Sequence, residues 1–280
     1  MKKNLSISFR AISSILVALR EFSQLNNLTE ILPAAASPGF EDYPSITVFW
    51  GSDSNPTFLL PTSSSFQKQI AAQHLGSVYC IAPCYRREEE SELRKLRHLE
   101  VFRQIEIEIS GGDMRAAIKL AQQLICYLSE HFPLDMQGIS PLAMDDFDSI
   151  DLSELADAEC PTEASFSVWS ENLSGLISRP TWILHTPQTY KPCLNKDYLD
   201  GLSKGFDLLL PFGYGELLSG GERDTHQAYS FLGINDDDLS LDFYSSGFGI
   251  GMERLISYFM QEPNISRLSL PGENGRLIRV

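Results

Sequence analysis

Three clusters of residues in the sequence have side chains suited to binding or catalysis, and the first cluster is rich in charge. It begins with Arg86 and Glu88 and ends with His98 and Phe102, with a charged loop between them. An arginine at a strand end can clamp a phosphate or a carboxylate, a histidine can contact a terminal phosphate, and an aromatic ring can stack on a base. Two strands joined by a charged loop also fit a solvated hairpin. The first cluster therefore predicts either a nucleotide site or an exposed hairpin.

The second cluster runs from Gly213 to Arg223 and combines glycines with carboxylates such as that of Glu216. Glycine lets the backbone approach a ligand closely, and carboxylate oxygens can hold a hard cation. The same pattern is typical of a turn-rich hairpin. The second cluster thus indicates either a cation site or a simple turn.

The third cluster places Gly247, Gly249 and Gly251 at two-residue steps, followed by Glu253 and Arg254. Glycines at this spacing leave one face of a strand bare, so that a flat ligand or another backbone could lie there. The spacing differs from the dinucleotide fingerprint, which needs a different third step. The two charged residues after the glycines also fit the exposed first turn of a helix.

The strand expected at 101–109 has two chemically different faces. Gln104, Glu106 and Glu108 share one face, and the isoleucines between them share the other. The isoleucine face belongs to a core, because successive side chains of a strand point to opposite sides. The polar face either meets solvent or lines a pocket, and periodicity alone leaves both open.

The elements that must position these residues follow from hydrophobic pattern and turn residues. We expect helices at about 5–19, 63–75, 113–132 and after 251, and strands at 28–32, 45–50, 57–60, 78–86, 101–109, 181–185, 206–210, 215–219 and 245–251. Consecutive strands without intervening helices favour an α+β fold, with an antiparallel sheet flanked by helices. We expect one domain over residues 1–280, with an irregular, acidic surface insertion at about 133–165.

The composition excludes several classes of function. The chain has 37 acidic against 22 basic residues and a net charge of −15, which opposes broad electrostatic binding of nucleic acid. No apolar stretch approaches the ~20 residues that span a bilayer, and polar residues interrupt the N-terminal segment where a signal peptide needs an apolar core. We therefore expect a globular, cytoplasmic protein without a membrane span.

Taken together, the three clusters resemble the motifs of class II aminoacyl-tRNA synthetases. The segment 85–106 is similar to the family's motif 2, the segment 247–255 is similar to motif 3, and Pro33 matches the dimer-interface proline of motif 1. Within the class, segments 63–69 and 206–223 resemble the aspartyl and asparaginyl subgroup. The resemblance implies the class II catalytic fold, ATP and Mg²⁺ as cofactors, and a homodimer.

The resemblance also implies a role for individual residues in ATP binding. Arg86, on the α-phosphate and the reacting carboxylate, and Arg254, beside the adenine and the γ-phosphate, would be the catalytic residues. The implied ATP site consists of Arg86 on the α-phosphate, Glu88 on the adenine amino group, Phe102 on the adenine face, His98 on the γ-phosphate, and Arg254 with Gly251 on the other side. Glu216 and Asp207 would bind Mg²⁺ on the triphosphate.

For the amino acid, the resemblance implies that Glu106 receives the α-ammonium and that Lys68 and Arg223 grip a carboxylate. Gln104 and Ser63 would complete the substrate site. Asparaginyl enzymes read a neutral amide and typically lack a lysine at the first of these cationic positions, so Lys68 indicates an acidic substrate. The alternative is that Lys68 is an ordinary exposed helix residue.

The resemblance leaves the acceptor of the activated amino acid open. Synthetases of this subgroup carry an anticodon-binding β-barrel before the catalytic core, which here begins at residue 1, so we expect no tRNA partner. The chain resembles archaeal-type asparagine synthetases, which make asparagine from aspartate, ATP and ammonia. The alternatives are transfer to another acceptor, such as a small amine, a carrier protein or a protein side chain, and a non-catalytic paralogue.

Overall fold

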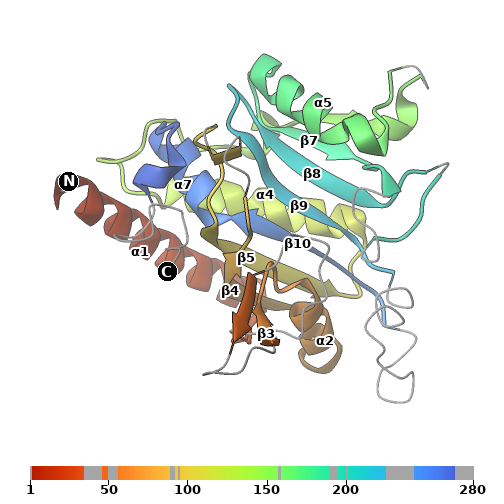
Figure 1. Ribbon diagram of the computed structural model, residues 1–280, viewed down its shortest axis with the longest axis horizontal. Helices are drawn as coiled ribbons and strands as arrows, with labels where there is room; N and C mark the ends of the chain where they lie inside the picture. Colours follow the sequence, from red (N-terminus) through yellow and green to blue (C-terminus); the bar gives the residue numbers. More distant parts are fainter. Residues whose placement is uncertain are drawn as a thin grey trace.

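The computed structural model describes residues 2–34, 46–49, 56–88, 92–93, 95–156, 159–188, 195–199, 201–224 and 243–268. An eight-stranded sheet forms its centre (Figure 1). The strands, in spatial order, are β1 (Thr29–Glu30), β4 (Val78–Tyr85), β5 (Val101–Ser110), β10 (Ser245–Gly251), β9 (Gly215–Glu222), β8 (Gly205–Leu210), β7 (Thr181–Leu184) and β6 (Asp148–Asp151). A separate antiparallel hairpin consists of β2 (Ile46–Phe49) and β3 (Pro56–Leu60).

The direction of the strands confirms the α+β fold and adds one feature to it. The six inner strands pair antiparallel, whereas β1 and β6 pair in parallel with their neighbours at the two edges. A parallel pair needs a crossover connection. Helix α2 (Ser65–Leu75) lies in the connection from β1 to β4, and helix α5 (Glu163–Leu176) connects β6 to β7. The sheet is therefore mixed, with an antiparallel centre.

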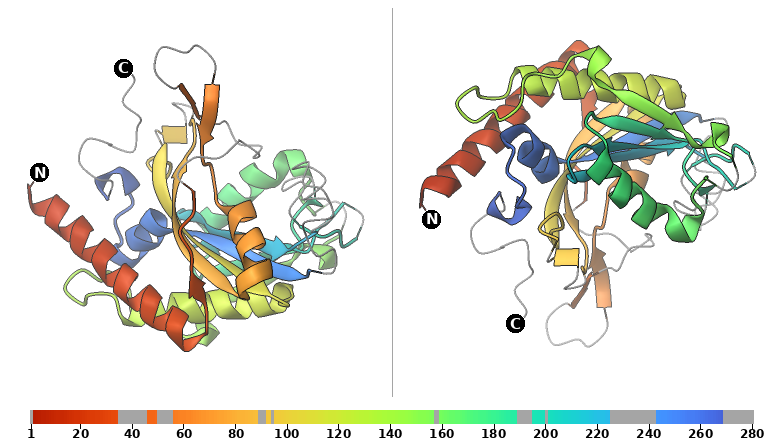
Figure 2. Two further views of the ribbon diagram at one scale, coloured as in Figure 1. Left: turned by 90° about the horizontal axis from the view of Figure 1, so that it is seen from below. Right: turned by 90° about the horizontal axis from the view of Figure 1, so that it is seen from above.

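Helices cover both faces of the sheet (Figure 2). Three helices, α1 (Lys2–Leu25), α4 (Met114–Glu130) and α7 (Met252–Met260), pack on one face and share the main hydrophobic core with it. Helices α2 and α5 lie on the opposite face, where α5 packs on a smaller apolar cluster that contains Ile183 and Leu209. Asp113, the first residue of the helix predicted at 113–132, caps α4: its carboxylate accepts a hydrogen bond from the backbone N–H of Ala116 at 2.8 Å.

Strand β5 shows which side of the sheet carries the polar groups. Ile105 and Ile107 are wholly buried in the main core, as the alternation predicts. Glu106 and Glu108 point to the other face and are only 2% and 0% exposed. The solvent alternative for this face is wrong, because α2 packs over β5 there.

The segment 133–165, expected to be irregular, contains an edge strand: residues 148–151 form β6. Helix α5 begins near the end of this segment and lies mostly beyond it, where we predicted no element. The apolar stripe of α5 consists of Phe166, Trp169 and Leu173, which pack in the smaller cluster. Serine and acidic residues between them obscure this helical spacing. The assignment of the whole chain to one domain stays a prediction.

In the part of the chain that the structure describes, no helix has the length and apolar character needed to cross a bilayer.

Candidate active site

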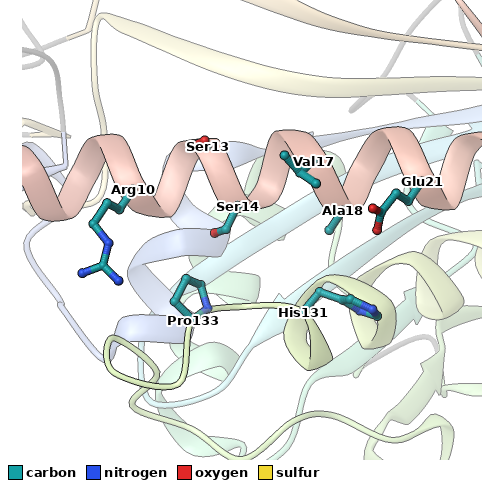
Figure 3. Close-up of a pocket in the computed structure, with 8 residues that line it drawn as sticks. All are labelled: Arg10, Ser13, Ser14, Val17, Ala18, Glu21, His131 and Pro133. Carbon is teal, nitrogen blue, oxygen red and sulfur yellow. The ribbon is translucent and has the colours of Figure 1, made fainter.

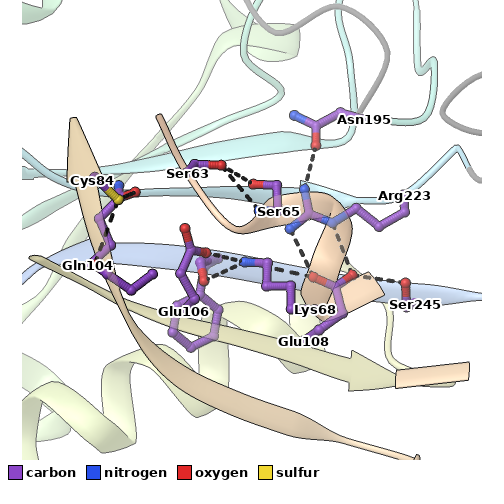
Figure 4. Close-up of polar contacts among 12 residues, drawn as sticks. Ser63, Ser65, Lys68, Cys84, Gln104, Glu106, Glu108, Asn195, Arg223 and Ser245 are labelled. Atoms are coloured by element: carbon purple, nitrogen blue, oxygen red, sulfur yellow. Dashed lines mark hydrogen bonds and ion pairs between the residues drawn. The ribbon is translucent and has the colours of Figure 1, made fainter. Parts of the chain in front are cut away.

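Four charged side chains form a buried ion-pair cluster between α2 and the sheet (Figure 4). They are Lys68, Glu106, Glu108 and Arg223, and none is more than 6% exposed. The Lys68 Nζ atom lies 2.5 Å from Glu106 Oε2, 2.8 Å from the carbonyl oxygen of Phe248 and 3.8 Å from Glu108 Oε2. Lys68 is thus no exposed helix lysine: it points into the sheet from the buried side of α2.

Arg223, at the end of β9, completes the cluster. Its Nε and Nη2 atoms donate to the two carboxylate oxygens of Glu108 at 3.0 and 3.1 Å, and Ser245 Oγ donates to the first of these oxygens at 2.8 Å. Arg223 Nη1 lies 3.4 Å from Asn195 Oδ1. The two cations and two carboxylates balance in charge, which matters because an unpaired buried charge costs several kcal/mol.

The glycines of β10 make room for these carboxylates. In the sheet register Gly247 lies beside Glu108, Gly249 beside Glu106 and Gly251 beside Gln104. A Cβ atom on Gly247 would overlap the Glu108 carboxylate, and one on Gly249 would lie 3.1 Å from Glu106 Oε2. The carboxylates of Glu108 and Glu106 therefore occupy the space that the missing side chains of Gly247 and Gly249 leave.

The charged residues of the first cluster lie at the other end of β4 and β5. The Arg86 guanidinium stands 5.0 Å from the centre of the Phe102 ring, and its Nε donates to the carbonyl oxygen of Thr62 at 3.2 Å. His98 Nδ1 is 3.9 Å from Glu88 Oε1, and its Nε2 is 3.5 Å from Glu92 Oε2. These contacts bring Arg86, Glu88, His98 and Phe102 into one region.

Arg254 joins this region from the first turn of α7. Its Nη2 donates to the carbonyl oxygen of Arg97 at 2.7 Å, and its Nη1 donates to that of Glu216. Burial lowers the pKa of Arg254, and the nearby Arg97 and Arg86 act in the same direction, whereas Glu216 and Glu88 oppose them. Three arginines thus face one region, which suits a polyphosphate.

The neighbouring Glu253 is not exposed either, so the interpretation of this pair as an exposed helix turn is wrong. Glu253 is 2% exposed and accepts hydrogen bonds from the backbone N–H and the Nη1 atom of Arg103, both at 2.9 Å. Burial raises the pKa of Glu253 despite these donors.

The two carboxylates expected to bind Mg²⁺ come from β8 and β9. Glu216 pairs with Leu209 and Asp207 pairs with Ser219, so the side chains of Glu216 and Asp207 share one face of the sheet. Among the described residues no three His, Cys, Asp or Glu side chains form a metal site. One or two carboxylates beside phosphates and water are what Mg²⁺ usually takes, so this donor set fits it.

The turn before Glu216 requires unusual backbone geometry. Phe212, Gly213 and Gly215 have φ values of 58°, 79° and 81°. Glycine adopts this left-handed region without strain, which explains two of the glycines in the second cluster. Leu210 and the turn residues after it connect β8 to β9, so this turn places Glu216 at the start of β9.

Gln104 and Ser63 flank the ion-pair cluster (Figure 4). Gln104 lies on β5 on the same face as Glu106, and its Oε1 accepts from Cys84 Sγ at 3.1 Å. Ser63 Oγ accepts from the backbone N–H of Ser65 at 3.1 Å, just before α2.

Sequence reasoning missed one residue of the ion-pair cluster, Glu108, and two residues that hydrogen-bond to the cluster, Asn195 and Ser245. Glu108 was visible in the β5 alternation, but no role followed from it. Asn195 and Ser245 gave no local signal, because they reach Arg223 and Glu108 only through the arrangement of distant strands.

A cavity of about 360 Å³ lies elsewhere, between α1 and the segment after α4 (Figure 3). Arg10, Glu21, His131 and Pro133 are among its lining residues. The expected site residues take no part in it, since α1 and α4 lie on the opposite face of the sheet from α2.

Similar proteins indicate a family for this arrangement. The model of a family described as tRNA synthetases class II (D, K and N) matches residues 1–237. Asparagine–tRNA ligases from Syntrophobacter fumaroxidans and Sorangium cellulosum are 26% and 24% identical over 75% and 90% of this chain. The chain spans 53% and 66% of their respective lengths.

Solved structures show the same fold. Asparaginyl-tRNA synthetase from Pyrococcus horikoshii, in complex with asparaginyl-adenylate, has a TM-score of 0.76 at 19% identity, covering 97% of this chain and 70% of that one. Aspartyl-tRNA synthetase from Entamoeba histolytica has a TM-score of 0.67 at 19% identity, covering 94% of this chain and 57% of that one. By the family match and this fold, the chain belongs to the class II tRNA synthetases of the D, K and N group.

Proposed function

We propose that this protein activates aspartate with ATP and transfers it to ammonia, giving asparagine, AMP and pyrophosphate. Its family membership supports ATP-dependent activation of an amino acid, since the relatives above are ligases. The choice of aspartate goes beyond that membership and rests on the buried ion-pair cluster, which can hold one carboxylate and the ammonium of an amino acid while a second carboxylate reacts. Ammonia as the acceptor follows from the resemblance to asparagine synthetases.

The observation that carries the proposal is the meeting of two buried cations at one carboxylate oxygen. Lys68 Nζ lies 3.8 Å and Arg223 Nη2 lies 3.1 Å from Glu108 Oε2. Two cations this close to each other suit a second, incoming carboxylate. A neutral cluster of paired charges also suits a zwitterion, whose carboxylate would join the cations while its ammonium joins Glu106.

The direction in which aspartate binds follows from the product. Asparagine forms only if the side-chain carboxylate is activated, so the α-carboxylate would contact Lys68 and Arg223. Glu106 would hold the α-ammonium, and Gln104 and Ser63 would line the space beside it. The opposite orientation would activate the α-carboxylate and would not give asparagine.

For ATP we propose the roles implied by the motifs. Phe102 would stack on adenine, Glu88 would accept from its amino group, and His98 would contact the γ-phosphate. Arg86 and Arg254 would be the catalytic residues, with Gly251 leaving room beside them. This assignment is supported by the contacts that bring the three arginines to one region.

In the reaction, the side-chain carboxylate attacks the α-phosphorus and pyrophosphate leaves with the electron pair of the broken P–O bond. Ammonia then attacks the acyl carbon, AMP leaves, and one proton is released. Arg86 would offset the charge that builds on the phosphate oxygens, and the protein would contribute mainly by positioning. Mg²⁺, held by Glu216 and Asp207, would supply further charge neutralisation on the triphosphate.

A second candidate function is transfer of the activated amino acid to tRNA or to another acceptor. The names of the relatives favour this candidate, because they are asparagine–tRNA ligases. Both candidates begin with the formation of an acyl adenylate from ATP, but transfer to tRNA would require that the α-carboxylate reacts. A homodimer and a cytoplasmic location stay predictions.

The experiment that tests the proposal measures pyrophosphate release from Mg-ATP with each of the twenty amino acids, with and without ammonium. We expect release with aspartate, and asparagine rather than its α-amide isomer when ammonium is present. Formation of the adenylate without any amide would show that ammonia is not the acceptor, and tRNA would be the first alternative acceptor to test. A lack of any aspartate-dependent release would refute the proposal.

A further inference from the structure

Helix α5 contacts the proposed nucleotide region through one carboxylate. Glu171 Oε1 lies 2.6 Å from Arg97 Nη2, and Glu171 Oε2 lies 2.8 Å from Lys95 Nζ. Both partners belong to the segment just before His98. Lys95 and Arg97 keep the pKa of Glu171 below its ordinary value, although partial burial opposes them, so this carboxylate is ionised at neutral pH.

Arg97 extends this contact to the residues proposed to bind ATP. Its Nη1 donates to the carbonyl oxygen of Gly213 at 3.0 Å, in the turn before Glu216. Its own carbonyl oxygen accepts from Arg254 Nη2 at 2.7 Å. A displacement of Arg97 would therefore disturb both Arg254 and the turn that leads to Glu216.

Helix α5 also contacts the β8–β9 turn before Glu216 through Ser174, which lies three residues after Glu171. Ser174 is wholly buried, and its Oγ donates to the carbonyl oxygen of Leu210 at 2.7 Å and accepts from the backbone N–H of Gly215 at 2.8 Å. The carbonyl oxygen of Ser174 accepts from the backbone N–H of Gly213 at 2.9 Å. Two residues of α5 thus fix the two segments that flank Arg254.

The negative charge of Glu171 offsets repulsion among the arginines of this region. Arginines gathered for a polyphosphate repel one another while no phosphate is present, and Arg97 adds a further positive charge beside Arg254. Glu171 supplies a negative charge from outside the region, so it holds Arg97 in place without itself competing for the nucleotide.

We propose that Glu171 is a positioning residue that fixes Arg97, and through it Arg254 and the turn before Glu216, for binding of the ATP phosphates. This inference rests on the proposed function, because it takes the region around Arg86 and Arg254 as the ATP site. It assigns α5 a part in nucleotide binding rather than in the core alone.

The test compares Glu171→Gln with Glu163→Gln, a matched change at an exposed position of the same helix. We expect Glu171→Gln to raise KM for ATP about threefold to tenfold, the range that two partly exposed ion pairs can supply, with little change in KM for the amino acid. Glu171→Asp should recover part of the loss, and Glu163→Gln should match the wild type. An unchanged KM for ATP, or equal rises for both substrates, would overturn the inference.

A second measurement separates this inference from the proposed function. Hydrogen exchange at the backbone amides of Lys95 and Leu96, which donate to carbonyl oxygens of Glu92 and Leu93, reports the order of the segment without any turnover. Faster exchange in Glu171→Gln than in Glu163→Gln would support the positioning role of Glu171 even if the wild type releases no pyrophosphate. Equal exchange in both variants would refute it.

Discussion

Replacing the glycines of β10 one at a time by alanine tests whether the Glu106 and Glu108 carboxylates pack against this strand as the structure shows. The perturbation is a single methyl group at Gly247, Gly249 or Gly251. At Gly247 the new Cβ would overlap the Glu108 carboxylate and lie 2.5 Å from the carbonyl oxygen of Ile107. The carbonyl oxygen of Ile107 cannot move unless β5 shifts. The more mobile Glu108 side chain would therefore be displaced from its position.

The expected magnitudes differ for the three positions. Displacing Glu108 from Arg223 and Ser245 breaks a buried pair, which costs about 3–5 kcal/mol of unfolding free energy. At Gly249 the nearest atoms are those of the Glu106 carboxylate at 3.1 and 3.2 Å, a tight contact that costs about 1 kcal/mol. At Gly251 the nearest atom is 3.7 Å away, so alanine should stabilise the strand by about 0.5 kcal/mol.

Urea unfolding followed by circular dichroism measures this order, with the free energies compared through the transition midpoints. Gly251→Ala serves as the internal control, because it adds the same methyl group to the same strand. If Gly247→Ala were as stable as the wild type, or if Gly251→Ala were the least stable of the three, the packing of Glu108 against β10 would be refuted.

Two further variants test the site, and a third tests an ion pair that lies away from it. Arg86→Ala should abolish adenylate formation, measured by pyrophosphate exchange, and wild-type activity would remove Arg86 from the catalytic region. Lys68→Leu should raise KM for aspartate by more than about tenfold with a much smaller effect on KM for ATP, and an unchanged KM for aspartate would end its role in binding the substrate carboxylate. The same change leaves Glu106 without its cation, so it should lower the unfolding free energy by about 3–5 kcal/mol in urea titrations. The hydrogen bond from Arg20 holds the pKa of Glu30 below its ordinary 4.5, so this pair stabilises the fold above that pH and its contribution is lost as the pH falls through the lowered value. Arg20→Gln should thus lower the free energy of unfolding slightly at pH 7, and this loss should shrink as the pH falls below 4.5; an equal loss at neutral and acidic pH would contradict this linkage.

The charge balance of the ion-pair cluster bears on how a substrate would enter. Without substrate, Lys68 pairs with Glu106 and Arg223 pairs with Glu108. An amino-acid zwitterion would add one carboxylate, next to Lys68 and Arg223, and one ammonium, next to Glu106. The net charge of the buried cluster would then stay zero. A single anion would leave the buried cluster with an excess charge, at a cost of several kcal/mol.

Much of the fold could be predicted because it depends on local pattern. The alternation along β5 indicated its core face, and Asp113 marked the start of α4. The prediction was poorer where an apolar stripe is broken by polar residues, as in α5, and where a strand is short and lies at an edge, as in β6. In these elements tertiary packing outweighs the weak local preference.

The amino-acid pattern was enough to identify the three clusters, the family that they resemble and the two faces of strand β5. The burial of the polar face of β5, the contact of Lys68 with Glu106 and the place of Glu108 in the same cluster became visible only in the folded chain. The reason is distance along the chain: Lys68 donates to a carbonyl oxygen 180 residues away, and Arg223 binds a carboxylate 115 residues away. Such contacts depend on strand order and register, which no local pattern encodes.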